Sequence, residues 1–172
     1  SSVTPTSIDQ LWESARGWMA GFILLLERDV GREALSLVSS PANPQAVFEY
    51  LAGEVMHRLP VETQQVLMTM GLVPDFTPDM AIALTARPEA EHILEQLHQS
   101  RYFIERREDR LGWYRFHPLF REFLLRRAVQ TMNPQGLGDL RRKAAALLVE
   151  AHLEEDALHL WQQAKAWDDY RA

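Results

Sequence analysis

The chain has 172 residues, 47% of them hydrophobic and 24% charged, a composition typical of globular proteins with a substantial core. The absence of cysteine excludes disulfides and thiolate metal sites and fits a reducing cytoplasm, which is the location we expect. The net charge of −6 argues against a surface that coats nucleic acid. No apolar run approaches the roughly 20 residues of a membrane-spanning helix, so no membrane partner is expected.

The first part of the chain predicts a helical segment, to which we assign residues 1–45. A second, largely buried helix is expected in WMAGFILLLERDV, residues 18–30. The turn-forming run SSPANPQ, residues 39–45, then marks the boundary of the segment. The first helix is predicted from apolar residues that share one face, namely Ile8, Leu11, Trp12 and Ala15.

Residues 46–132 predict a winged-helix domain. Apolar spacing indicates one helix that stops before Pro60 and another that starts there. Thr77 is a good N-cap, and Pro78 suits the first position of a short helix. A further helix is expected from Pro88 to about Ser100.

A β-hairpin completes the predicted domain. The stretches YFIERR, residues 102–107, and WYRFH, residues 113–117, flank a turn that contains Gly112. Three helices followed by a hairpin is the winged-helix order, a variant of the helix-turn-helix. A helix from Pro118 to about Thr131 is expected to pack after the wing.

Residues 133–172 predict a helical hairpin that resembles a tetratricopeptide unit. The run MNPQGLG, residues 132–138, is interpreted as a linker, and helices are expected at 139–152 and 154–164. One such hairpin cannot bury its own face, so further repeats are expected to follow. The fold class is therefore mainly α: a helical segment, a winged helix with a small β-hairpin, and a tetratricopeptide-like hairpin. The small and aromatic positions of a tetratricopeptide unit are matched in the predicted hairpin by Ala145, Ala157, Trp161 and Ala164.

The sequence lacks the motifs of common catalytic sites. There is no glycine-rich loop that could cradle a triphosphate, no H-E-x-x-H or G-x-S-x-G motif, and no metal-spaced histidine cluster. We therefore expect no enzyme activity and no cofactor held by this chain alone.

His117 is the candidate binding residue, because it stands where a strand pattern changes to a helix pattern. A helix N-terminus presents unpaired N–H groups that favour an anion, and a neutral imidazole adds a donor for a phosphate. Pro118 fixes the backbone of the first helical residue. The alternative is a histidine that caps a backbone carbonyl between strand and helix.

Arginines between residues 101 and 127 invite a DNA-binding interpretation, since this stretch carries a net charge of +4. The third helix of the domain, however, carries Glu89, Glu91 and Glu95, which would repel phosphates in a DNA groove. The wing arginines are expected to form exposed pairs with neighbouring acids, namely Glu105, Glu108 and Asp109. A stand-alone DNA-binding winged helix and a helical protein-binding scaffold remain the alternative functions.

Two stretches together resemble the winged-helix part of MalT-like, large LuxR-family transcriptional regulators, which are signal-transduction ATPases with numerous domains. They are AVFEYLAGEVMHRLPVETQQVLMTMGLV, residues 46–73, and RYFIERREDRLGWYRFHPLFREFLLRRA, residues 101–128. The resemblance implies a nucleotide-binding domain, a helical domain, a winged helix, a helical-repeat sensor and a C-terminal LuxR-type DNA-binding domain. This chain would run from late in the helical domain into the first sensor repeats.

The resemblance also assigns roles to two residues. His117 matches the winged-helix histidine that contacts the β-phosphate of bound ADP and locks the resting state. GWMAGFILL matches the helical-domain motif whose apolar residue packs near adenine, and Met19 stands where that motif usually has a proline. A thioether can still pack on the adenine ring, so Met19 is the second candidate binding residue; otherwise it is a core methionine at a helix start. The implied partners are the protein's own nucleotide-binding domain, an effector at the repeats, DNA through the C-terminal domain only, and further copies when active.

Overall fold

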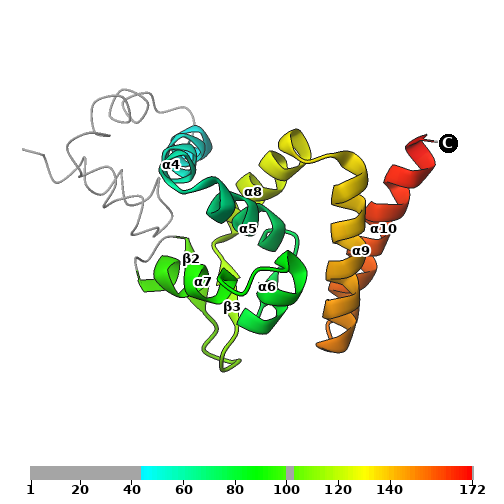
Figure 1. Cartoon of the computed structure of the whole chain (residues 1–172). Helices are drawn as coiled ribbons and strands as arrows, with labels where there is room; N and C mark the ends of the chain where they lie inside the picture. Colours follow the sequence, from blue (N-terminus) through cyan, green and yellow to red (C-terminus); the bar gives the residue numbers. More distant parts are fainter. Residues whose placement is uncertain (1–43, 100–102, 172) are drawn as a thin grey trace, which may run out of the picture.

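Residues 44–99 and 103–171 are described by the computed structural model, and most of them are helical (Figure 1). Met19 and the two helices predicted in the first segment lie outside these residues. None of the described helices is long and apolar enough to cross a bilayer. The expected mainly α class, with a small sheet and a terminal helical hairpin, is confirmed.

The winged helix is built from helices whose ends follow the sequence signals. The side-chain oxygen of Thr77 accepts a hydrogen bond from the Met80 N–H at 3.2 Å, and Pro78 is the first helical residue. Pro60 is the N-cap residue of its helix, which begins one residue later than the expected start at Pro60. The helices of this part are α4 (Pro44–Arg58), α5 (Val61–Met70), α6 (Pro78–Thr85) and α7 (Ala90–Gln99).

The sheet has three strands, one more than the predicted hairpin. β2 (Ile104–Arg106) pairs antiparallel with β3 (Tyr114–Phe116), which confirms the hairpin. β1 (Asp75–Phe76) pairs with the other edge of β3, so the order is β1-β3-β2. A strand of two residues leaves no alternation to detect, which is why the sequence pattern did not predict it.

Three helices follow the sheet: α8 (Pro118–Thr131), α9 (Pro134–Glu150) and α10 (Glu154–Arg171). The last two form an antiparallel pair at one side of the molecule (Figure 1). The predicted linker at 132–138 is wrong. The helix begins at Pro134, and the Asn133 side chain accepts a hydrogen bond from the Gln135 N–H at 2.9 Å. The predicted end of the last helix at residue 164 is also too early.

A continuous core joins the winged helix to the hairpin. Its largest buried side chains include the aromatic rings of Phe76, Phe116 and Phe120, from β1, β3 and α8. In the hairpin, the expected small residues Ala145, Ala157 and Ala164 are buried, whereas Trp161 is 44% exposed. Small residues at the contact let α9 and α10 approach each other closely.

Candidate functional site

His117 occupies the corner between β3 and α8, where it is the N-cap residue of the helix. Its backbone N–H donates to the carbonyl of Phe103 at 2.7 Å, and its own carbonyl accepts from the N–H of Arg121 at 2.9 Å. Pro118 follows as the first helical residue, as the sequence predicted. The corner is therefore held to the start of the wing on one side and to the helix on the other.

The imidazole of His117 is half-buried against an aromatic cluster. Its ring stacks on Phe48 with the centroids 6.0 Å apart and the planes at 25°. Phe103 meets Phe48 edge-on at 5.6 Å and stacks on Phe120 at 4.1 Å. These contacts fix the orientation of the imidazole, since the Phe48 ring beneath it is itself packed in the core.

No hydrogen bond to the His117 side chain occurs within the described part of the chain. Nδ1 is buried without a partner, and the side chain does not cap the helix. The alternative in which the ring caps a backbone carbonyl is therefore not supported by this geometry. A buried polar atom without a partner costs free energy, so it requires either a functional or a structural explanation.

Burial lowers the pKa of His117, and the nearby negative charge of Glu105 only partly offsets this effect. The ring is consequently neutral at pH 7, with one nitrogen protonated and the other not. Nδ1 is enclosed without a partner, whereas Nε2 is not among the enclosed atoms. When the proton is on Nε2, this nitrogen is the hydrogen-bond donor that a ligand can reach.

The start of α8 adds backbone donors beside this ring. Pro118 has no N–H, so Leu119 and Phe120 supply the first free backbone N–H groups of the helix. No acidic residue lies in the first turn, and the dipole of a 14-residue helix favours an anion there. The corner therefore offers an imidazole and a helix N-terminus, two kinds of group that favour a phosphate-like anion.

A metal is not indicated as the ligand of this corner. Among the residues with described side chains, no group of three histidine or carboxylate side chains could hold a metal ion. His117 lines neither the cavity between α5, α8 and α9 nor the smaller one that Thr77 and Trp113 line.

Two of the three wing arginines pair with carboxylates, but only one of these carboxylates, Asp109, is among those that the sequence suggested. Arg106 pairs with Glu95 of α7 at 2.7 Å, and the Tyr114 hydroxyl donates to the same carboxylate at 2.9 Å. Of the predicted neighbours, only Asp109 is used, by Arg107. Arg110 packs over the Trp113 ring at 5.1 Å. The cations of the wing are therefore committed to the domain itself.

Asp75 is a buried acidic residue of the sheet that the sequence did not single out. It is buried on β1 and accepts from Arg115 at 2.7 Å and from Arg107 at 3.2 Å, which ties β3 and the residue that follows β2 to β1. The guanidinium of Arg107 is also hydrogen-bonded to Asp109, and this contact lowers the pKa of Asp109 to about 2. No sequence signal marks Asp75, because its partners are 32 and 40 residues away.

The comparisons with known proteins all point to one protein family. The profile of the MalT winged helix domain matches residues 52–135, which contain the described strands and the corner at His117.

Curated relatives named HTH-type transcriptional regulator MalT match at 33% identity over 129 residues in Vibrio campbellii and at 36% over 126 residues in Vibrio cholerae. These matches cover 75% and 72% of this chain and 14% of each relative. The MalT of Cronobacter sakazakii is 23% identical over 163 residues, covering 91% of this chain and 18% of the relative. The chain thus spans about a seventh of the length of the two Vibrio relatives. It corresponds to a segment of a MalT-like regulator, and residues 52–135 belong to the MalT winged helix domain family.

Proposed function

We propose that this chain is a regulatory, non-catalytic segment of an ATP-dependent transcription activator of the LuxR family. The winged helix would hold the ADP-bound resting state and relay effector binding at helical repeats to a DNA-binding domain elsewhere in the full-length protein. The observation that carries the proposal is the oriented, neutral and unpartnered imidazole of His117 beside the free N–H groups of α8.

In the resting state, the nucleotide-binding domain would hold ADP, and His117 would donate a hydrogen bond to its β-phosphate. The contact links two domains through the nucleotide, so it stabilises the closed arrangement only while ADP is bound. A ligand shifts such an equilibrium by its difference in affinity for the two states. Effector binding and exchange to ATP would release the winged helix and allow self-assembly in the cytoplasm.

The comparisons support the regulatory part of this proposal. The relatives that match over most of this chain carry the name transcriptional regulator, and the family match spans the corner at His117. A neutral imidazole also suits the role, because it can donate to a phosphate without adding a charge that must be neutralised after release.

The test is the His117→Ala substitution in the full-length regulator, with transcription measured in the absence of effector. We expect basal transcription to rise and ADP to bind roughly 10- to 100-fold more weakly, since a hydrogen bond to a charged group contributes about 1.5–3 kcal/mol. His117→Gln keeps an N–H donor at a similar reach and should restore part of the ADP affinity.

His92→Ala is the control, because His92 is an exposed histidine on α7, away from the corner. It should leave both readouts unchanged. If His117→Ala accumulates to normal levels and leaves basal transcription and ADP affinity as in the wild type, the phosphate role of His117 is wrong.

A further inference from the structure

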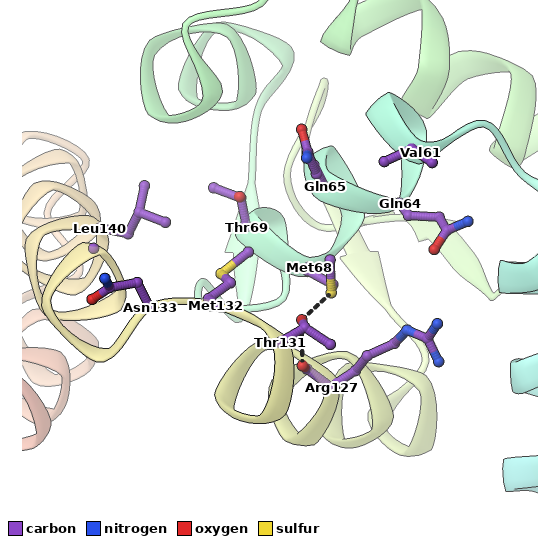
Figure 2. Close-up of a pocket in the computed structure, with 11 residues that line it drawn as sticks. Val61, Gln64, Gln65, Met68, Thr69, Arg127, Thr131, Met132, Asn133 and Leu140 are labelled. Atoms are coloured by element: carbon purple, nitrogen blue, oxygen red, sulfur yellow. Dashed lines mark hydrogen bonds between the residues drawn. The ribbon is translucent and has the colours of Figure 1, made fainter.

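A cavity of about 650 Å³ lies between α5, the C-terminal end of α8 and the first turns of α9 (Figure 2). This volume is within the range of small-molecule sites. Its lining comes from the winged helix on one side and from the helical hairpin on the other. His117 is not part of it, so the cavity is separate from the proposed nucleotide contact.

One wall of the cavity is apolar and adaptable. It combines Met68 of α5 and Met132 after α8 with Leu140 of α9 and Val61, which is an exposed apolar side chain at the start of α5. Unbranched thioether side chains fill irregular spaces and adjust to ligands of different shape. This wall suits a short apolar body.

Arg127 supplies a cation to the same cavity. Its guanidinium makes no hydrogen bond or ion pair with any residue whose position is described, and the residue as a whole is partly buried. The preceding residue, Arg126, is fully engaged, with Glu49 at 2.7 Å and Glu122 at 3.0 Å. A guanidinium without a counter-ion beside an apolar wall favours a carboxylate partner, which it can bind through two parallel N–H···O hydrogen bonds.

Several uncharged polar groups of the lining already have partners. The Gln64 amide donates to the Leu59 carbonyl at 2.9 Å, and Gln65 accepts from Arg87 at 3.1 Å. The Thr131 hydroxyl donates to the Arg127 carbonyl at 2.8 Å. In Figure 2 the Arg127 guanidinium and Leu140 lie on opposite sides of Met68. The lining therefore offers one free cation and an apolar wall.

We propose that this cavity binds a small amphipathic carboxylate, with the carboxylate on Arg127 and the apolar part against Met68, Met132 and Leu140. Such a ligand touches both the winged helix and α9, so it would couple the hairpin to the winged helix. The proposal does not depend on the nucleotide contact at His117, and either can fail without the other.

The experiment is a calorimetric titration of the 172-residue chain with octanoate, acetate and octanol as separate probes. We expect saturable binding of octanoate, with acetate and octanol at least tenfold weaker because each lacks one half of the recognised chemistry. Equal affinity for acetate indicates an adventitious ion only, and equal affinity for octanol removes the role of Arg127. Either result, or no saturable binding of octanoate, overturns the proposal.

Matched variants locate the site. Arg127→Gln should weaken octanoate about tenfold, whereas Arg126→Gln should not. Gly136→Leu should abolish binding, since Gly136 lines the cavity and a Cβ there meets no atom within 4 Å. Gly53→Leu is its control, because Gly53 has equally open space but lies on α4 outside the cavity. Wild-type affinity in Arg127→Gln or in Gly136→Leu, with the fold checked by circular dichroism, contradicts the assignment.

Discussion

At the scale of single residues, His117 combines a fixed backbone with a side chain that has no hydrogen-bond partner among the residues described. Its N–H and carbonyl are both hydrogen-bonded, while Nδ1 is enclosed without one. The aromatic contact with Phe48 orients the ring, and its burial disfavours the charged form. The site is thus organised before any ligand arrives, which reduces the entropy that binding must offset.

The lowered pKa of His117 predicts a pH dependence of stability. The folded-state pKa lies below the usual 6.5, so the unfolded chain takes up the proton first as the pH falls. The stability that depends on neutral His117 is therefore present above about pH 6.5 and is lost as the pH falls through the folded-state pKa. NMR titration of the imidazole signals measures this pKa directly, with His117→Gln to assign the signal.

Urea unfolding at pH 7.5 and pH 5 supplies the second readout. The loss of stability between the two pH values should be smaller for His117→Gln than for the wild type, since glutamine does not titrate. A His117 pKa at or above 6.5 would contradict the burial that the structure shows.

Asp75 predicts a different effect, on the stability of the wing. Asp75→Asn leaves Arg107 and Arg115 without their shared carboxylate, and we expect a loss of about 1–3 kcal/mol in the free energy of unfolding. Asp109→Asn is the matched control, since Asp109 binds the same Arg107 but is 61% exposed, against 13% for Asp75. Its effect should be small, and chemical denaturation of both variants compares them.

An equal effect of the two substitutions would show that the position of the carboxylate on β1 does not matter.

The sequence could predict His117 but not Asp75, for a physical reason. A change of period from strand to helix is a local signal, whereas the partners of Asp75 become neighbours only when β1 pairs with β3.

At the scale of helices and strands, local chemistry set most boundaries correctly. Thr77 with Pro78 and His117 with Pro118 each start a helix where the sequence indicated one. The start of α9 differs from the predicted linker at 132–138 because the run MNPQGLG is rich in turn-forming residues, although Asn133 and Pro134 carry the ordinary cap signal. A glycine in the first helical turn is tolerated when the packing of α9 against α10 stabilises the helix.

Alanine substitutions at two glycines are predicted to change the free energy of unfolding in opposite directions. A Cβ on Gly71 would lie 2.9 Å from the Cβ of Leu124, so Gly71→Ala forces the two helices apart and should cost about 1–3 kcal/mol. Gly53→Ala meets no atom within 4 Å in the helix α4 and should stabilise the chain by about 0.5–1 kcal/mol. Thermal unfolding separates the two, and a stabilised Gly71→Ala would show that the contact yields readily.

At the scale of the whole molecule, the distribution of charge decides what the winged helix can bind. Arg106 and Arg107 are paired with Glu95, Asp75 and Asp109, so wing cations are not free for phosphates. The sequence predicted that these arginines would be paired, but the carboxylates of Asp75 and Glu95 come from β1 and α7, through tertiary contacts that sequence separation conceals.

The last prediction is that the chain does not bind DNA by itself. In a gel shift with a duplex of about 25 base pairs at about 50 mM salt, we expect no complex at concentrations on the order of 10 μM, where basic domains bind non-specifically. The double variant Glu89→Lys and Glu91→Lys replaces two acids of the α7 region and serves as the positive control, since it should gain salt-dependent binding. A salt-dependent shift with the wild-type chain would favour a DNA-binding winged helix and contradict the paired state of the wing arginines in solution.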